Sequence, residues 1–143
     1  MYQDVLVPTD GSDASAAAVD HAVSIADRYD ATVHLLHVVD LGTEMSASGV
    51  GTIADELTST LESEADDALD DAGSRAEEAG VDYERTTVEG VPHEAIVAQA
   101  ADRDADLVVM GASGRSGLRE HLLGSTTDRV VRSTDASVLV ARE

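Results

Sequence analysis

The sequence predicts an α/β fold of a single domain, residues 1–143: a three-layer sandwich in which a doubly wound, five-stranded parallel sheet lies between helices. Short apolar runs alternate with helical segments in a single pass along the chain, which is the order of a parallel sheet. Right-handed crossovers would place helices on both faces of that sheet. The run at residues 32–39 is almost continuously apolar, as expected for a parallel strand that is covered on both faces.

The beginning of the chain predicts a strand, a turn and a helix. Residues 4–7 form a short apolar run, and the sequence Pro-Thr-Asp-Gly-Ser follows at once. This turn places Ser12 or Asp13 as the N-cap of a helix. Residues 14–29 are rich in alanine and carry apolar side chains at helical spacing, so we expect the helix there.

The middle of the chain predicts a buried strand, a loop and the longest helix. The strand at 32–39 is followed by residues 40–51, which show no apolar period and which we expect to form a mobile loop. Apolar side chains then recur every three or four residues from 52 to 79. Ten acidic residues and one arginine lie between Asp55 and Glu78, which we interpret as a solvated outer face and not as a metal site.

The C-terminal part completes the alternation. Gly80 ends the long helix, and the strand after it is less hydrophobic than the others, which favours a place near the edge of the sheet. The first and fourth strands are the expected neighbours at the topological switch point, because an unusual turn follows each of them. The expected elements are a strand at 83–88, a helix at 93–102 with Pro92 in its first turn, a strand at 107–110, a short helix at 127–132 and a strand at 137–141.

The charge of the chain excludes several classes of function. Twenty-nine acidic residues and nine basic ones give a net charge of −20, and all nine basic residues are arginine. This balance opposes binding to nucleic acid and to anionic membranes. The absence of lysine excludes Schiff-base chemistry and the P-loop lysine, and the absence of cysteine excludes disulfides and thiolate chemistry.

Composition also bears on where the protein works. The chain has no run of 18 apolar residues, and it enters its first strand without a charged and apolar leader, so we expect a cytoplasmic protein without a membrane span. An acidic surface without lysine and with few aromatic residues is typical of halophile proteins, in which molar salt shortens the Debye length to roughly 3 Å. We therefore interpret the chain as one from a halophile.

A glycine-rich segment follows the fourth strand and is typical of an anion site. Gly111, Gly114 and Gly124 have the spacing Gly-x2-Gly-x9-Gly, and Ser125 and Thr126 follow at the start of a helix. Glycine lets the backbone approach a ligand closely, and a helix N-terminus favours negative charge. Residues 103–132 hold five arginines and four acidic residues, a net charge of +1, and Arg115 is the arginine best placed to contact a phosphate.

These features together resemble the universal stress protein family, and specifically its nucleotide-binding branch. The resemblance covers the whole chain, from Val5-Leu-Val-Pro-Thr-Asp-Gly-Ser12 through His37-Val-Val39 to Val138-Leu-Val140. Its most specific part is the Gly-x2-Gly-x9-Gly-Ser pattern, which the chain fits without a gap. The resemblance implies an adenine nucleotide alpha hydrolase-like fold with the strand order 3-2-1-4-5.

The resemblance further implies an ATP site. Backbone amides and hydroxyl groups of the glycine-rich segment would hold the phosphates and the ribose, and the end of the first strand would line the opposite wall. Val39, at the end of the second strand, would pack against the adenine or hydrogen-bond it through its backbone, and Met110 would form part of the floor. The implied binding residues are Pro8, Thr9, Asp10, Val39, Met110, Gly111, Gly114, Arg115, Gly124, Ser125 and Thr126.

Asp10 would face a triphosphate, so we expect it either to bind Mg²⁺ or Mn²⁺ that accompanies the nucleotide or to bond a ribose hydroxyl. His34 and His37 are three residues apart on a strand, point to opposite faces and cannot share a metal ion.

The function implied is that of an ATP-binding stress-response module in which the nucleotide gates binding to an unknown protein partner. The chain shows no catalytic pattern such as Gly-x-Ser-x-Gly, so we expect no dedicated catalytic residues and at most slow ATP hydrolysis. The family resemblance implies a homodimer that pairs through residues 137–141. Two alternatives remain open: a structural homodimer or partner-binding protein that binds no nucleotide, and an ATP-using enzyme of related fold.

Overall fold

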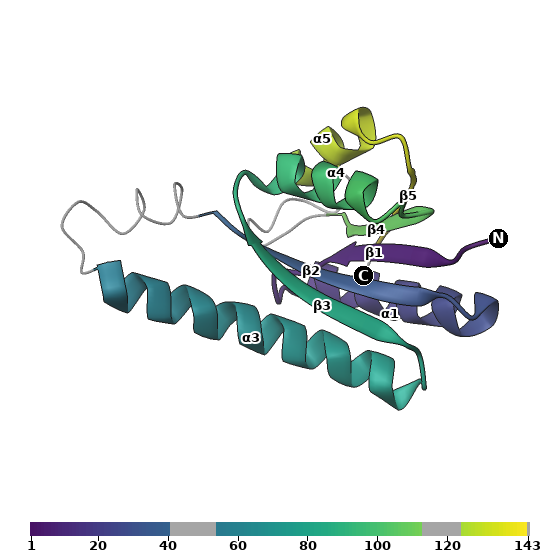
Figure 1. Cartoon of the computed structure of the whole chain (residues 1–143), viewed down its shortest axis with the longest axis horizontal. Helices are drawn as coiled ribbons and strands as arrows, with labels where there is room; N and C mark the ends of the chain where they lie inside the picture. The colour runs from purple at the N-terminus through teal and green to yellow at the C-terminus, as the bar shows by residue number, and fades with distance from the viewer. Residues whose placement is uncertain (41–53, 113–123, 143) are drawn as a thin grey trace.

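The structure is a computed structural model that describes residues 1–40, 54–112 and 124–142, with the side chains of 54–58 outside the description. Strands and helices alternate along these residues (Figure 1). The elements are β1 (Asp4–Pro8), α1 (Asp13–Tyr29), β2 (Thr32–Val39), α3 (Ala54–Glu78), β3 (Tyr83–Glu89), α4 (Pro92–Asp102), β4 (Leu107–Gly111), α5 (Ser125–Ser133) and β5 (Ser137–Ala141).

The five strands form one parallel sheet in the order β3-β2-β1-β4-β5. The predicted fold class and strand order are therefore confirmed, as are the neighbouring positions of β1 and β4 and the edge position of β3. The chain leaves β1 toward β2 on one side and later returns to β4 on the other. The sheet thus has its switch point between β1 and β4, where the carboxyl ends of two strands diverge into different connections.

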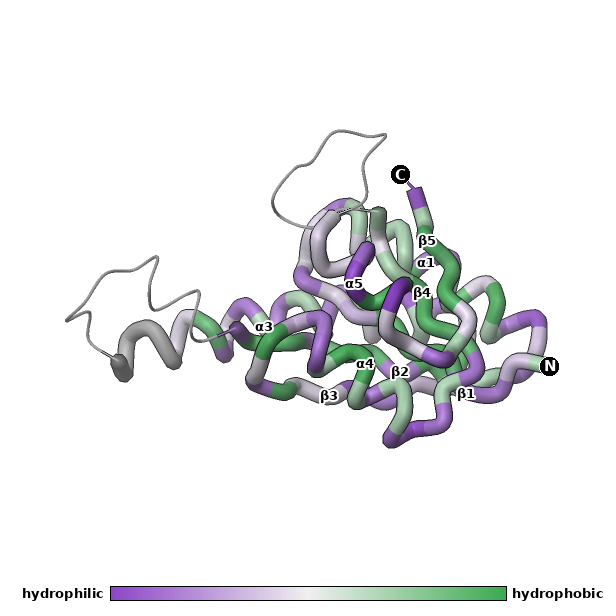
Figure 2. Tube along the Cα trace, turned by 90° about the horizontal axis from the view of Figure 1, so that it is seen from above, coloured by the Kyte–Doolittle hydropathy of each residue, from purple (hydrophilic) through white to green (hydrophobic). Residues whose placement is uncertain are grey.

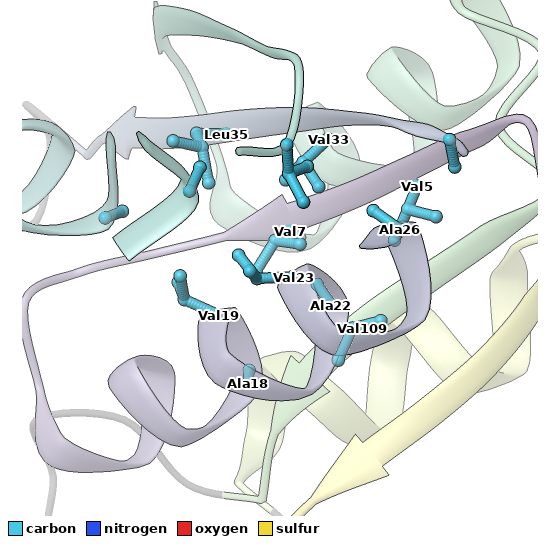
Figure 3. Packing of buried hydrophobic residues seen from close by; sticks show 14 of the residues in the cluster. Val5, Val7, Ala18, Val19, Ala22, Val23, Ala26, Val33, Leu35 and Val109 are labelled. Atoms are coloured by element: carbon cyan, nitrogen blue, oxygen red, sulfur yellow. The ribbon is translucent and has the colours of Figure 1, made fainter. Parts of the chain in front are cut away.

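Helices cover both faces of the sheet, with α1 and α3 on one face and α4 and α5 on the other (Figure 1). Alternate residues of β1 and β2 point into each layer. Val5 lies beside Ala26 and Val7 beside Val23 of α1 (Figure 3), whereas Leu6 packs on the opposite face. The hydropathy of the elements agrees with their positions. β4 and β5 are hydrophobic, whereas hydrophobic and hydrophilic residues alternate along α3 (Figure 2).

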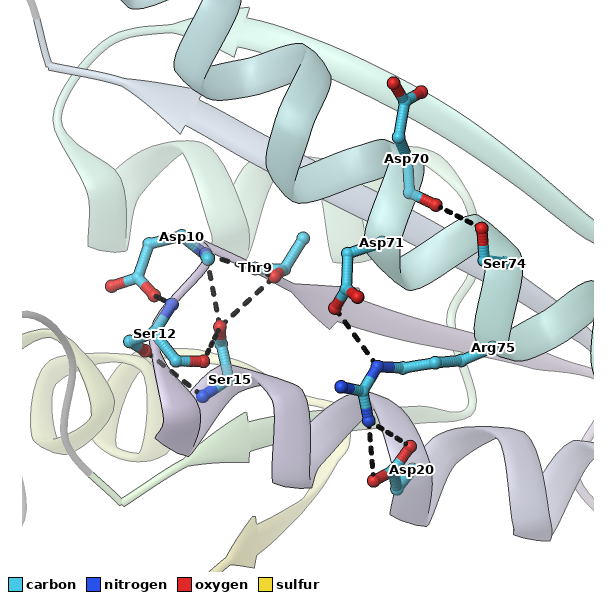
Figure 4. Close-up of polar contacts among 10 residues, drawn as sticks. Thr9, Asp10, Ser12, Ser15, Asp20, Asp70, Asp71, Ser74 and Arg75 are labelled. Atoms are coloured by element: carbon cyan, nitrogen blue, oxygen red, sulfur yellow. Dashed lines mark hydrogen bonds and ion pairs between the residues drawn. The ribbon is translucent and has the colours of Figure 1, made fainter.

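The helix termini agree with the turn residues in the sequence. Ser12 is the N-cap of α1, and its side-chain oxygen accepts a hydrogen bond from the Ser15 amide. Gly80 follows the end of α3 with φ +71°, a conformation that favours glycine. The acidic α3 is joined to α1 by Arg75, which donates to Asp71 on its own helix at 3.1 Å and to Asp20 of α1 at 2.8 Å (Figure 4).

Three sequence predictions concern features outside the core. The expected loop at 40–51 lies almost wholly outside the described residues. Among the residues that the structure describes, no group of three His, Asp or Glu side chains could hold a metal ion. No helix within the same residues has the length and apolar character needed to cross a membrane.

Candidate functional site

A cavity of about 320 Å³ lies at the carboxyl ends of β1 and β4, where the topology predicts a ligand site. This volume falls in the range of small-molecule sites, roughly 300 to 1,000 Å³. Two backbone segments bound the cavity, which we call the loop wall (residues 9–15) and the helix wall (residues 124–127). The described lining residues are Pro8, Thr9, Asp10, Ser15, Leu36, Val38, Pro92, Ile96, Met110, Gly111, Gly124, Ser125, Thr126 and Thr127.

The loop wall is held by a continuous set of hydrogen bonds (Figure 4). The Ser15 hydroxyl donates to the carbonyl of Ser12 at 3.0 Å, so in its 3.1 Å contact with the Thr9 hydroxyl it is the acceptor. The Asp10 carboxylate accepts from the Ser12 amide at 2.9 Å, which closes a tight turn. Thr9 and Ser15 are both buried, and their hydroxyl groups are used in fixing this turn.

His37 supports the loop wall from β2. Its Nδ1 lies 2.8 Å from the carbonyl oxygen of Thr9. A carbonyl oxygen only accepts, so Nδ1 carries the proton and donates it. The His37 side chain is 8% exposed, and this bond satisfies one of its polar atoms in the interior.

The helix wall is the first turn of α5. Gly124 is the N-cap, and no side chain within the described part of the chain makes a capping hydrogen bond there. The first turn of a helix has amides without partners inside the helix, and their dipoles favour an anion. Thr127 is buried, and its hydroxyl donates to the carbonyl of Gly111 at 2.8 Å, while the Gly124 amide donates to Ala112 at 2.7 Å. These two bonds fix α5 against the end of β4.

Gly111 has a structural reason to be glycine that the spacing pattern does not reveal. A Cβ atom at this position would lie 2.8 Å from the backbone carbon and oxygen of Ala14. Real Cβ atoms essentially never approach backbone atoms so closely, so any side chain would push α1 away from β4. Gly111 therefore permits the close approach of α1 to the strand at the cavity.

The other end of the cavity is apolar. Leu36, Val38, Ile96 and Met110 line it from β2, α4 and β4. Pro92 closes this end at the start of α4. The arrangement gives one apolar end and one end rich in backbone amides and hydroxyl groups, which suits a ligand with a flat apolar part and an anionic part.

The structure brings most of the predicted site residues together. Those that line the cavity are Pro8, Thr9, Asp10, Met110, Gly111, Gly124, Ser125 and Thr126. Gly114 and Arg115 lie outside the described residues. Val39 does not line the cavity; its carbonyl accepts from the Gly90 amide at 3.0 Å, and a backbone contact from Val39 to a ligand stays a prediction.

Sequence reasoning missed lining residues on four elements: Ser15 of α1, Leu36 and Val38 of β2, Pro92 and Ile96 of α4, and Thr127 of α5. Val38 faces the cavity instead of Val39, because side chains alternate along a strand and Val38 shares its face with Leu36. This alternation could have been used to predict Val38 from the sequence. Ile96 and Pro92 of α4 gave no signal, since only the packing of α4 against β2 brings them to the site.

The described lining residues offer groups that can bind a ligand. Asp10 is the only charged side chain among the described lining residues. The nearby buried imidazole has its Nδ1 proton engaged by the Thr9 carbonyl. Within the described part of the site, therefore, no nucleophile is paired with a general base.

Comparisons with known proteins agree with this architecture. The sequence pattern of the universal stress protein family matches residues 1–142. Universal stress protein MJ0531 of Methanocaldococcus jannaschii is 39% identical over 145 residues, covering 100% of this chain and 84% of the relative. The solved structure of MJ0577 from the same organism is 32% identical with a TM-score of 0.88, covering 100% of this chain and 97% of that one.

A second solved structure carries a ligand. It is a universal stress protein in complex with cAMP, 33% identical to this chain with a TM-score of 0.72, and the match covers 99% of this chain and 97% of that one. The match of the family pattern extends over all five strands and the cavity between them. The chain belongs to the universal stress protein family.

Proposed function

We propose that the cavity binds ATP and that the protein is a nucleotide-gated stress-response module with at most slow ATP hydrolysis. The observation that carries the proposal is the combination, in one cavity, of an apolar end and the N-terminus of α5, which no side chain of the described residues caps. A purely structural protein has no need of that combination. The cAMP complex of a relative supports an adenine nucleotide as the class of ligand.

The phosphates belong at the helix wall in this proposal. The amides of Ser125 and Thr126 lie in the first turn of α5, where the helix dipole favours negative charge. The hydroxyl groups of the Ser125 and Thr126 side chains add hydrogen-bond donors in the same turn. Gly114 and Arg115, which the family resemblance implies as binding residues, would complete the phosphate site.

The adenine belongs at the apolar end. Leu36, Val38, Ile96 and Met110 offer aliphatic and thioether surface to a planar base. Burying apolar area contributes about 25 cal/mol per Å². This end of the cavity therefore favours the base and disfavours the phosphates, which fixes the direction in which a nucleotide enters.

Asp10 fits a divalent cation only together with the nucleotide. One of its carboxylate oxygens accepts from the Ser12 amide, and no second carboxylate lines the described part of the cavity. Mg²⁺ is commonly bound by one or two carboxylates together with substrate phosphates. Asp10 would hold Mg²⁺ or Mn²⁺ against ATP phosphates, and the cation would neutralise the charge that Asp10 and the phosphates bring together. A bond from Asp10 to a ribose hydroxyl is the alternative role.

Assembly is part of the same proposal. β5 is an edge strand of the sheet, and an edge strand offers unpaired backbone groups to a second chain. We expect a cytoplasmic homodimer that pairs through residues 137–141, with an unidentified protein partner whose binding responds to the nucleotide.

Calorimetric titration with Mg·ATP, ADP and cAMP tests the binding step. We expect saturable heat with ATP and a weaker response to cAMP, whose single cyclic phosphate makes fewer contacts with the helix wall. A protein that gives no saturable heat with any of the three contradicts nucleotide binding, and one that binds only cAMP contradicts the choice of ATP. A phosphate-release assay measures hydrolysis, and turnover above about 1 s⁻¹, the lower range of ordinary enzymes, contradicts a binding module.

A further inference from the structure

His37 lies where β1 leaves the sheet. Thr9 is the first residue after β1, and its amide still donates to the carbonyl of Leu36 at 2.8 Å, as in a continued parallel ladder. In that register the next ladder bond would run from the amide of Val38 to the carbonyl of Thr9. The partner that the structure gives this carbonyl is the His37 ring, with Nδ1 at 2.8 Å. The imidazole thus supports the backbone at the point where β1 turns into the loop wall.

The carbonyl of Thr9 belongs to the same peptide unit as the amide of Asp10, and the peptide bond is planar. The direction of the carbonyl therefore sets the direction of the amide. His37 holds this unit from the carbonyl side, and the Ser15 hydroxyl lies 3.4 Å from the amide on the other side. Asp10 follows this unit directly and lines the cavity, so the position of its carboxylate depends on these two contacts together with the hydrogen bond that it accepts from the Ser12 amide.

We propose that His37 is a positioning residue for the ligand site: its Nδ1–H orients the Thr9–Asp10 peptide unit and so places Asp10 for the nucleotide or its cation. The inference rests on the proposed function for its ligand, but the orientation of the peptide unit is a property of the protein alone. His37 is not among the lining residues, so it acts through Thr9 and not by contact with the ligand.

His34 provides a matched control on the same strand. It is 7% exposed, close to the 8% of His37, and it too has a polar partner, Asp4, at 2.8 Å from its Nε2. Its other ring nitrogen lies near Glu84 and Arg103, and none of these partners lines the cavity. Replacing either histidine by leucine removes a buried imidazole from β2, but only the change at His37 removes support from the loop wall.

The experiment compares His37→Leu, His37→Asn and His34→Leu with the wild type. An asparagine amide places a donor near the position of Nδ1, so His37→Asn should retain the bond. We expect the Kd for Mg·ATP to rise about ten- to hundredfold in His37→Leu, the effect of losing one well-placed buried hydrogen bond. The Kd should stay within about threefold of the wild type in His37→Asn and His34→Leu, while the thermal midpoint falls in both leucine variants.

Amide hydrogen exchange in the ligand-free proteins measures the orientation of the peptide unit independently of ligand binding. We expect the Asp10 amide to exchange faster in His37→Leu than in the wild type, and at the wild-type rate in His34→Leu. Equal exchange in all the proteins, or an equal rise in Kd for both leucine variants, overturns the positioning role. A wild type that binds no nucleotide overturns the proposed function instead, and the exchange rates still decide whether His37 orients the peptide unit.

Discussion

Ser125→Asp should weaken phosphate binding at α5 without lowering the stability of that helix. Ser125 is the first residue of α5, is exposed and lines the cavity. A carboxylate in the first turn of a helix stabilises it by about 0.3 to 1 kcal/mol, because it lies near the positive end of the dipole. The same carboxylate would repel a phosphate bound to that turn. The substitution should therefore leave the fold as stable as before or more so while it weakens binding.

The size of the repulsion follows from Coulomb's law. Two like charges about 4 Å apart repel by about 1 kcal/mol in water and by about 4 kcal/mol at the effective dielectric constant of a protein surface. A difference of about 1.4 kcal/mol is tenfold in affinity, so we expect the Kd for ATP to rise about five- to several hundredfold. The rise should shrink from 0.1 M to 1 M KCl, since the Debye length falls from about 10 Å to about 3 Å.

Calorimetry with ATP and with adenosine measures the effect, and Ser133→Asp is the matched control. Ser133 is exposed at the last position of the same helix, so this variant has the same charge and the same substitution far from the first turn. We expect adenosine to bind equally to all three proteins and ATP to bind Ser133→Asp as it binds the wild type. An unchanged Kd for ATP in Ser125→Asp would refute phosphate binding at α5. Equal losses of ATP and adenosine would refute the division of the cavity into a phosphate end and a base end.

Three further predictions concern the fold. Gly111→Ala should lower the free energy of unfolding by about 1 to 3 kcal/mol, because the new Cβ would overlap the Ala14 backbone. Gly73→Ala should lower it less, since a Cβ there would meet only the movable Tyr83 ring, and urea unfolding compares the two variants. The Asp106 carboxylate accepts hydrogen bonds from the amides of Asp4 and Gln3, which lowers its pKa below the ordinary value of 3.8. Asp106→Asn should therefore destabilise the fold at pH 7 and lose its effect as the pH falls through that lowered pKa, as pH-dependent urea unfolding would measure. The thermal midpoint should rise from 0.1 M to 1 M KCl, because salt screens the repulsion within a net charge of −20; a midpoint that falls would contradict the halophile interpretation.

The sequence was sufficient to predict the strands and their order. Most of the strands are marked by their own apolar runs, and the order follows from the family that the whole chain resembles. β2 and β5 have the predicted bounds, and β1 and β4 each extend one residue further than expected. The long helix is described from Ala54, so its predicted start at residue 52 lies outside the described residues, and its end at Glu78 is one residue before the predicted 79, a difference of the size expected at helix ends.

The site was less predictable, because two of its features depend on distances between elements. The sequence predicts a phosphate-binding role for Gly111. The structure shows in addition that α1 packs so closely on Gly111 that a side chain at this position would overlap the helix. Ile96 reaches the cavity through the packing of α4, which no local pattern encodes. That Val38 turns its side chain toward the cavity was within reach of the sequence, since Val38 and Val39 alternate between faces of the same strand; the backbone contact predicted for Val39 stays a prediction.

The two helices that follow β1 and β4 begin differently at the same edge of the sheet, and this difference explains why one of them suits an anion. The first turn of α1 is satisfied internally: Ser12 accepts from the Ser15 amide, and the Asp10 carboxylate accepts from the Ser12 amide. A second anion there would meet both a used amide and a negative charge. The first turn of α5 has Gly124 as N-cap, and among the described residues no side chain makes a capping hydrogen bond there. The acidic loop wall and the uncapped helix wall thus have opposite electrostatic characters across one cavity, which suits an anionic ligand that brings its own cation to Asp10.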